Sequence, residues 1–301
     1  MMKPLSQSNS QLSVEKPIRS GAGWKRTMPV FFIYVILIVT AIVVLYPIYF
    51  VFIGSLNPGN TLFNSKMFPD HLTIKHFVDL IHRNDGDTNF VQWYKNTLFV
   101  AVMNMLLSTF LVVTTAYAFS RFRFPGRRQG LMTMLVLQMF PGFMGMIAIY
   151  ILLLQMGLLD NLWGLILVYA GGSIPFGSWL VKGYFDGLPR SLEEAAKIDG
   201  ASNTTIFLKV VVPLSVPILT FVAVMNFIGP WMDFIFARLV LRSNDKLTLA
   251  IGLFNMVSGR ENTNFTEFAA GAVLVSIPIT LLFFFFQKYI IEGVTAGANK
   301  G

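Results

Sequence analysis

Six long apolar runs constrain this chain more than any other feature of its sequence. They cover residues 29–56, 97–119, 131–156, 162–185, 214–236 and 268–291. A helix needs about 20 largely apolar residues to cross the hydrocarbon core of a bilayer, and each run is long enough to do so. Lys25 and Arg26 precede the first run, but that run is longer than a signal-peptide core and no small-residue cleavage site follows it. The pattern predicts an all-α, polytopic membrane protein with six transmembrane helices.

Composition agrees with a membrane-embedded chain. Of 301 residues, 54% are hydrophobic and only 13% are charged, whereas soluble domains have roughly 25% charged residues. The chain has no cysteine, which excludes disulfide frameworks, thiolate metal sites and cysteine nucleophiles. No metal or cofactor site is expected in this chain.

The distribution of basic residues predicts the orientation of the chain. Most of the 23 Lys and Arg residues lie in the N-terminal tail, the turn at 120–130, the segment 188–213 and the C-terminus. With six spans these four regions share one side of the membrane, and the side richer in Lys and Arg is the cytoplasmic one. Residues 1–28 and 292–301 are therefore expected as cytoplasmic tails and 57–95 as an extracellular loop. The net charge is +8, but the basic residues are concentrated in the loops and tails of one side of the membrane and form no separate patch. No nucleic-acid partner is therefore expected.

Gly and Pro residues fall inside four successive apolar runs. Such residues are tolerated at membrane depth where neighbouring protein or a water-filled cavity satisfies the backbone. They are predicted to interrupt these helices and to mark either a transport pathway and hinge or ordinary helix packing. The residues are Pro141-Gly142, Gly171-Gly172 with Pro175, Pro217 and Gly229-Pro230.

Residues 188–213, here called the EAA segment, are polar although they lie between two apolar runs. Ser191 and Glu194 have the S-x-x-E spacing of a capping box, which predicts a helix over 192–199. Gly200 can adopt the left-handed conformation that ends a helix. Ser202 or Asn203 is expected to cap a second helix that closes at Pro213. The segment should therefore form a helix, a glycine corner and another helix on the cytoplasmic surface.

The spacing within this segment carries a family resemblance. Glu194-Ala195-Ala196, three residues, Gly200, nine residues and Val210-Val211-Val212-Pro213 resemble the signature of permease subunits of ATP-binding cassette (ABC) importers, with valines in place of the usual Ile and Leu. The stretch 266–297 resembles the C-terminal region of the smaller permease subunit of maltose importers. The resemblance covers nearly the whole chain from the first span onward. It implies a type I ABC importer permease fold, with residues 96–291 as the core transmembrane domain.

The resemblance also implies partners and site residues. Residues of the EAA segment and of the C-terminal tail would contact an ABC ATPase dimer: Glu194, Ala195, Ala196, Gly200, Pro213, Gly297 and Lys300. A loop on the outer face would meet an extracellular sugar-binding protein through Asn255, Gly259, Arg260 and Asn262. A larger homologous permease subunit would complete the membrane part, in the bacterial cell membrane. Helix capping alone for Glu194, and a mere connection for the outer loop, are the alternatives.

An enzyme is not expected. The chain has no G-x-x-x-x-G-K-[ST] sequence, so ATP and Mg²⁺ are expected on a separate ATPase chain. The three histidines, His71, His76 and His82, all lie in the first outer loop, away from any intramembrane protease arrangement. Asp233 and Arg238, near the outer end of the fifth span, are expected to form an interfacial ion pair, with a proton relay as the alternative. The expected cargo is an oligosaccharide, with maltose or maltodextrins first and galacto-, arabino- or raffinose-type sugars as alternatives. An ion-coupled carrier or channel that works alone is the alternative from another class.

Overall fold

The computed structural model describes all residues except 1–22, 61–68, 70, 84–88, 259–263 and 299–301. The described residues are almost entirely helical and contain no β-strand, which confirms the all-α prediction. The elements in chain order are α1 (Gly23–Ser55), α2 (Lys75–His82), α3 (Phe90–Arg121), α4 (Arg127–Gln138), α5 (Gly142–Gln155), α6 (Leu162–Gly187), α7 (Arg190–Ile198), α8 (Asn203–Ile206), the π-helix η1 (Phe207–Val211), α9 (Val212–Leu214), α10 (Val216–Met232), α11 (Ile235–Val240), the 3₁₀-helix η2 (Asn244–Lys246), α12 (Leu249–Ser258) and α13 (Phe265–Ala298).

Four helices are long and apolar enough to cross a membrane by themselves, namely α1, α3, α6 and α13. Two further apolar stretches each consist of two helical parts with a sharp bend between them. The α4–α5 pair bends by 99°, and residues Asn203–Leu214 bend by 81° relative to α10. The described residues therefore provide up to six spans if each bent pair counts as one.

Residues 1–50 form one compact unit, and its described part is most of α1. The apolar side chains of α1 from Val30 onward are largely exposed. Exposed apolar side chains on all faces of a helix are expected where the surroundings are lipid instead of water.

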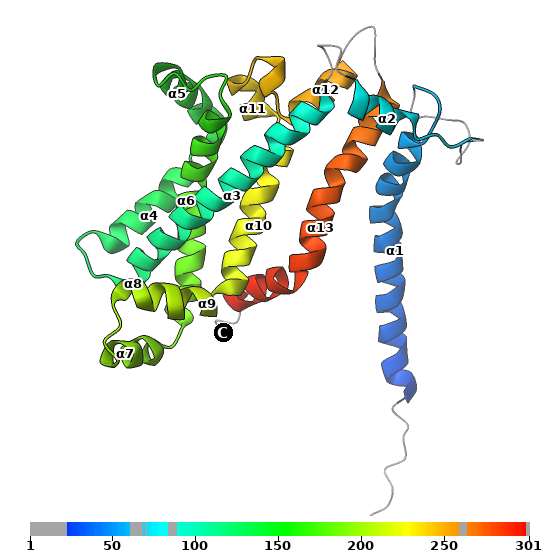
Figure 1. Cartoon of the computed structure of the whole chain (residues 1–301). Coiled ribbons are helices and arrows are strands. Elements are labelled where there is room, and N and C mark those ends of the chain that lie inside the picture. Colours follow the sequence, from blue (N-terminus) through cyan, green and yellow to red (C-terminus); the bar gives the residue numbers. More distant parts are fainter. Residues whose placement is uncertain (1–22, 61–68, 70, 84–88, 259–263, 299–301) are drawn as a thin grey trace, which may run out of the picture. The chain divides into compact units, whose positions relative to one another are not determined.

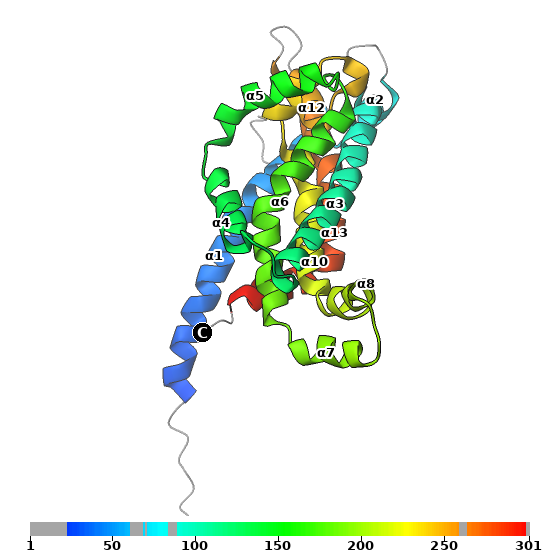
Figure 2. The same cartoon turned by 90° about the vertical axis from the view of Figure 1, so that its left-hand side faces the viewer.

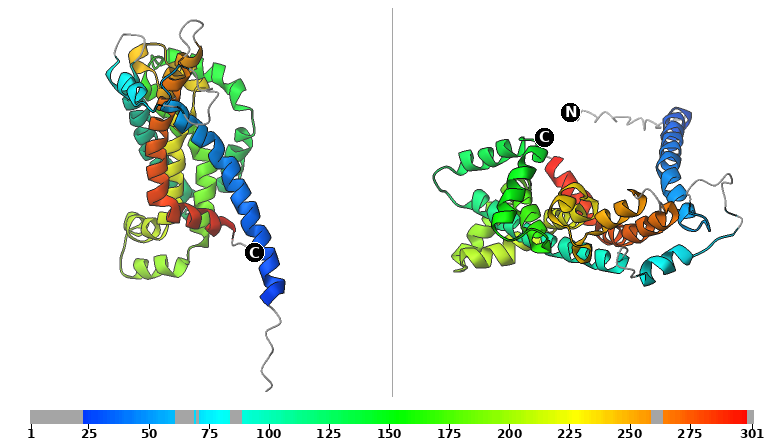
Figure 3. Two further views of the ribbon diagram at one scale, coloured as in Figure 1. Left: turned by 90° about the vertical axis from the view of Figure 1, so that its right-hand side faces the viewer. Right: turned by 90° about the horizontal axis from the view of Figure 1, so that it is seen from above.

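The second unit, residues 51–301, is built on α3, α6, α10 and α13, which lie side by side (Figures 1 and 2). α3 packs along both α6 and α10, and α10 packs against α13. Helices α2, α5, α11 and α12 gather at one end of this bundle, and the EAA segment with α7, α8 and α9 lies at the opposite end (Figures 1 and 3). The last turns of α13 run across the beginning of α10 (Figure 1). There a Cβ at Gly293 would lie 3.0 Å from the Pro217 carbonyl oxygen.

Two apolar cores stabilise the two ends of the bundle. The core at the α12 end surrounds Trp93, which is 1% exposed and packs directly on Gly252. The Trp93 indole N–H donates to the backbone and side-chain oxygens of Asn244, both at 3.1 Å. The second core lies beneath the EAA segment and includes Val181, Phe185 and Ile206. Because buried side chains of both cores come from several helices, each end of the bundle is a packed unit.

The predicted helix breaks are confirmed at two of the four places. Pro141 lies at the break between α4 and α5, so the run 131–156 is interrupted at the predicted place. Pro217 lies in the first turn of α10, beside the 81° bend. The other two predictions were wrong, because α6 runs through Pro175 and α10 runs through Pro230. Neighbouring helices and local adjustments can compensate for a missing backbone N–H in a membrane helix.

The region predicted as an outer loop, residues 57–95, contains the helix α2 and the first turns of α3. A bidentate ion pair at 2.8 Å joins Arg83 to the buried carboxylate of Glu267 in α13. The Thr266 hydroxyl donates to the Gly59 carbonyl at 2.8 Å. These contacts attach the connection after α1 to the beginning of α13.

The predicted ion pair between Asp233 and Arg238 was wrong. The Asp233 carboxylate instead accepts the backbone N–H groups of Phe236 and Ala237 at 3.1 Å, at the start of α11, and it also accepts the hydroxyl of Tyr169. Arg238 is exposed. A carboxylate that accepts the free N–H groups of a first helical turn stabilises that helix. This stabilisation is larger than the small contribution of a solvent-exposed ion pair.

Hydrogen bonds of Asp160 connect the turn between α5 and α6 to the end of α11 and the residues that follow it. Its backbone has φ +54° and its N–H donates to the Val240 carbonyl at 2.9 Å. Its carboxylate accepts the backbone N–H groups of Arg242 and Ser243 at 2.9 and 3.0 Å and the Ser243 hydroxyl at 2.5 Å. Burial raises the pKa of Asp160, but these hydrogen bonds and the charge of Lys246 outweigh it and lower the pKa to about 2.

Candidate functional site

The EAA segment forms two helical parts with a glycine corner between them, as predicted. Gly200 has φ +83°, the left-handed conformation that glycine adopts at little cost. The Ser202 hydroxyl then accepts the backbone N–H of Thr205 at 3.2 Å and caps the second part. That part continues through α8, η1 and α9, so Pro213 lies inside it and the chain bends at Ser215. The π-helix η1 is a rare conformation that often occurs at functional sites.

The start of the first helix differs from the prediction. α7 begins at Arg190 with Pro189 as its N-cap, so Ser191 lies inside the helix and no capping box forms between Ser191 and Glu194. The Pro189 carbonyl accepts the N–H of Leu192. Because the ring fixes φ of Pro189 near the value that helices need, the chain can begin the helix directly after it. Glu194 is therefore free of a capping role in this structure.

The two consecutive glutamates of α7 have opposite environments. Glu194 and Ala195 are exposed, whereas Glu193 is buried and Ala196 packs against the core beneath the segment. Successive helix residues point about 100° apart, and residues three apart share a face. Glu193 and Ala196 thus form the inner face of α7, and Glu194, Ala195 and Ile198 form its outer face. Ile198 is 87% exposed, so the outer face of α7 presents a large apolar side chain beside Glu194 and Ala195.

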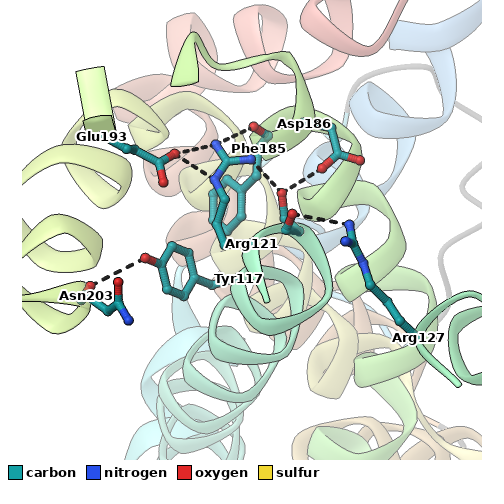
Figure 4. Close-up of polar contacts among 8 residues, drawn as sticks. Tyr117, Arg121, Arg127, Phe185, Asp186, Glu193 and Asn203 are labelled. Carbon is teal, nitrogen blue, oxygen red and sulfur yellow. Dashed lines mark hydrogen bonds and ion pairs between the residues drawn. The ribbon is translucent and has the colours of Figure 1, made fainter. Parts of the chain in front are cut away.

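A network of charged and polar groups attaches the inner face of α7 to two spans (Figure 4). The Arg121 guanidinium, at the end of α3, lies 2.6 Å from the Glu193 carboxylate. The same guanidinium donates to the Phe185 carbonyl and to the Ser120 hydroxyl, each at 2.8 Å. The Ser120 hydroxyl donates in turn to Asp186 of α6 at 2.6 Å. These contacts attach α7 to the ends of α3 and α6.

The second part of the EAA segment is held by aromatic and backbone contacts. The ring of Tyr117 in α3 lies 4.7 Å from the ring of Phe207, and its hydroxyl donates to the Asn203 carbonyl at 3.4 Å (Figure 4). The hydroxyl of Tyr184 in α6 donates to the Leu214 carbonyl at 3.2 Å. Both parts of the segment are thus attached to the same two helices, and they enclose the buried side chains of Ile206 and Val211.

The structure brings together only some of the predicted site residues. Glu194, Ala195, Ala196, Gly200 and Pro213 lie in one continuous segment. Gly297 lies in the last turns of α13, and Lys300 lies outside the described residues. On the opposite end of the bundle Asn255 is exposed in α12, whereas the predicted residues Gly259, Arg260 and Asn262 also lie outside the described residues. The sequence reasoning missed Glu193 and Arg121, because their pairing joins residues far apart in the chain.

Comparison with known proteins agrees with this architecture. Residues 112–295 match the family of binding-protein-dependent transport system inner membrane components. The chain belongs to this family. As a multi-pass permease component, it has curated relatives along almost its whole length. It is 42% identical to the galactooligosaccharides transport system permease protein GanQ of Bacillus subtilis, over 92% of this chain and 98% of the relative. It is 39% identical to the maltodextrin transport system permease protein MdxG of the same species, over 89% of this chain and 95% of the relative.

A solved structure supports the fold of this family member. A chain in the crystal structure of a bacterial ABC transporter involved in the import of the acidic polysaccharide alginate is 27% identical, with a TM-score of 0.74. The similarity covers 91% of the present chain and 99% of that chain. The helical bundle with its terminal EAA segment is therefore the fold of ABC transporter permeases.

Proposed function

We propose that this permease component belongs to an ATP-driven importer of oligosaccharides and works with a second, larger permease subunit of the maltose type. The observation that carries the proposal is the combination of an exposed Glu194-Ala195 face with relatives that are named for galactooligosaccharide and maltodextrin transport. The family description refers to binding-protein-dependent transport, so an extracellular sugar-binding protein is the proposed donor of the cargo.

Maltose and maltodextrins are the first proposed cargo. Permeases named for maltose or maltodextrin, from several bacterial species, are 34–39% identical to this chain. Galactooligosaccharides are the second candidate, because a permease named for them is 42% identical. Two polar groups in the spans take part in helix packing: the Asn104 amide donates to the Asn226 carbonyl of α10, and the Asn226 amide donates to the Val222 carbonyl of its own helix.

The outer face of α7 is the proposed docking surface for an ABC ATPase dimer. Glu194 is available to a basic group of the partner, and Ala195 and Ile198 offer a small and an apolar contact beside it. Insertion of a short helix into a groove of a partner is a common mode of recognition. Closure of the ATPase dimer would displace α7, and the Glu193–Arg121 attachment would transmit this displacement to α3 and α6. The C-terminal tail is a second proposed contact with the ATPases.

The proposed orientation puts the EAA segment and both termini in the cytoplasm. Arg121, Arg123, Arg127, Arg128 and Lys182 all belong to the end of the bundle that carries α7. A surplus of basic residues marks the cytoplasmic side. The exposed Asn255 of α12 then lies on the outer side, where the binding protein would dock.

Uptake of radiolabelled maltotriose tests the proposal, in cells that carry the intact chain or a deletion of it. Unlabelled maltodextrin, galactobiose and raffinose serve as competitors. Loss of uptake on deletion, with competition by maltodextrin alone, supports the first cargo. Competition by galactobiose alone moves the assignment to galactooligosaccharides. Uptake that persists after ATP depletion would contradict an ATP-driven importer and favour an ion-coupled carrier.

A further inference from the structure

A basic pocket opens between the beginning of α4 and the second half of α6. It has a volume of about 580 Å³ and is lined by Phe124, Gly126, Arg127, Arg128, Gln129, Leu131, Met132, Leu135, Trp179 and Lys182. The beginning of α4 and the last turns of α6, which supply its lining, lie at the end of the bundle that also carries the EAA segment (Figure 2). None of these residues takes part in the proposed docking of the ATPase or the binding protein.

The turn before α4 holds this pocket in a defined shape. Gly126 has φ +78°, a conformation that lets the chain reverse direction directly before Arg127. The ring of Phe124 packs edge-on against Phe119 of α3, with 5.3 Å between ring centroids. The Arg127 guanidinium donates to the Ser120 carbonyl at 3.2 Å, so this side chain is anchored at the pocket wall (Figure 4). The Arg127 guanidinium is therefore positioned before any ligand arrives.

The charge of the pocket is positive and largely uncompensated. Lys182 pairs with Asp186 on the same helix. Within the described part of the chain, no carboxylate forms an ion pair with Arg127 or Arg128. The planar guanidinium groups have several donors that suit two oxygens of a phosphate. A negatively charged phosphate is the ligand group that these two arginines fit.

Beyond the basic groups and Gln129, the pocket is lined mainly by apolar side chains of α4 and α6. Leu131, Met132 and Leu135 extend along α4 away from the arginines, and Trp179 of α6 lies opposite them with 46% of its surface exposed. Basic groups at one end and apolar groups toward the bilayer centre match the two ends of a phospholipid. Basic pockets between transmembrane helices are known to bind anionic lipid head groups, and tryptophan favours the interface between head groups and acyl chains.

We propose that this pocket binds one anionic phospholipid, with its phosphate on Arg127 and Arg128 and an acyl chain along Leu131, Met132 and Leu135. The bound lipid bridges α4 and α6. Since α4 is the first half of a broken span, the lipid stabilises the position of this half-helix against α6. This inference depends on the membrane-spanning architecture and is independent of the sugar and of the ATPase.

Native mass spectrometry of the purified full chain, titrated with phosphatidylglycerol, tests the proposal. The variant Arg127→Gln/Arg128→Gln is compared with Arg123→Gln/Arg190→Gln, which removes two exposed arginines from the same end of the chain outside the pocket. We expect the first variant to lose roughly tenfold or more of its affinity, since each basic residue near an anionic membrane surface contributes about a fivefold factor. The second variant should bind normally, and Arg127→Lys/Arg128→Lys should restore part of the binding.

Several outcomes would overturn the proposal. Equal losses in both double variants would indicate general attraction to the basic end of the chain. Competition by inorganic phosphate or glycerol phosphate, without retention of phosphatidylglycerol, would assign the pocket to a soluble anion. Binding of phosphatidylcholine with the same affinity would remove the role of the arginines. Occupation of the pocket by the second permease subunit would exclude the lipid from the assembled transporter, which the same measurement on the complex detects.

A second measurement needs no change to the arginines. Trp179 lines the pocket, so phosphatidylglycerol with brominated acyl chains should quench its fluorescence in nanodiscs more than brominated phosphatidylcholine does. The difference between the two lipids should vanish in Trp179→Phe. Equal quenching by both lipids would contradict a specific anionic site, even if the arginine variant did not fold.

Discussion

The Arg121 guanidinium at the end of α3 lies 2.6 Å from the Glu193 carboxylate of α7, and both side chains are at most 10% exposed. Each charge is thus largely removed from water, and the opposite charge of its partner compensates for the lost hydration. Loss of one partner of a buried ion pair costs about 3–5 kcal/mol, because the remaining charge stays buried without compensation. This pair therefore stabilises the attachment of the EAA segment to the bundle.

We expect Glu193→Ala to lower the free energy of unfolding by about 3 kcal/mol, at the low end of that range. Arg121 keeps its hydrogen bonds to the Phe185 carbonyl and the Ser120 hydroxyl, and these bonds reduce the loss of free energy of unfolding. Thermal unfolding of the detergent-solubilised chain measures the effect. The adjacent Glu194→Ala is the matched control and should leave stability unchanged, because Glu194 is exposed. The double variant Arg121→Met/Glu193→Leu should recover most of the stability, and a further loss there would argue against an isolated buried pair.

Charge reversal at Glu194 should separate coupling from folding. We expect Glu194→Lys to abolish sugar uptake and co-purification with the ATPase while the unfolding temperature of the chain stays unchanged, since the side chain is exposed. Asp245→Lys is the matched control: it reverses an exposed charge at the opposite end of the bundle. Normal ATPase binding by Glu194→Lys would show that the outer face of α7 is not the docking surface.

The sequence predicted the features of the EAA segment that depend on neighbouring residues. The corner at Gly200 and the cap at Ser202 were confirmed because each depends on a backbone conformation or a hydrogen bond within three residues. The capping box at Ser191 was wrong because Pro189 can begin the helix two residues earlier. Competing local signals of similar strength cannot be ranked without the surrounding structure.

Long-range pairing is what the sequence could not provide. Glu193 and Glu194 are identical residues, and the one on the inner face of α7 pairs with Arg121, 72 residues earlier, beside the core that Ala196 contacts. In the spans, apolar length predicted where helices lie but not whether they stay straight. Pro141 breaks its helix, whereas Pro175 and Pro230 do not, because the cost of a proline depends on which neighbours satisfy the freed carbonyl.

The low pKa of Asp160, about 2, predicts a specific loss of stability in acid. A carboxyl whose pKa is lowered in the folded state stabilises the fold above its ordinary pKa of 3.8, and this contribution disappears as the pH falls through about 2. The unfolding temperature of the solubilised chain should therefore fall between pH 4 and pH 2. Asp160→Asn, which tolerates the left-handed backbone, should be less stable at neutral pH and should lack this part of the acid dependence. The exposed Asp245→Asn should retain it, and identical pH profiles for the wild type and Asp160→Asn would contradict the prediction.

Close packing of Gly252 on Trp93 predicts a strong effect of one methyl group. A Cβ at position 252 would lie 2.0 Å from the indole ring, and the indole cannot move without breaking its bonds to Asn244. We expect Gly252→Ala to cost about 1–3 kcal/mol of stability through overpacking. Gly229→Ala in α10, where no atom lies within 4 Å of the added Cβ, is the control and should be neutral or slightly stabilising. Unfolding temperatures of the two variants give the comparison, and equal values would contradict it.

The absence of cysteine from the sequence makes the orientation of the chain directly measurable. Ala195→Cys and Asn255→Cys each introduce one exposed thiol, in α7 and α12 at opposite ends of the bundle. If the basic-rich end is cytoplasmic, a membrane-impermeant maleimide should label Asn255→Cys in intact spheroplasts and Ala195→Cys only in inside-out vesicles. The cysteine-free parent controls for other reactive groups. Labelling in the reverse pattern would put the EAA segment outside the cell, where no ATPase could reach it, and the importer proposal would fail with the orientation.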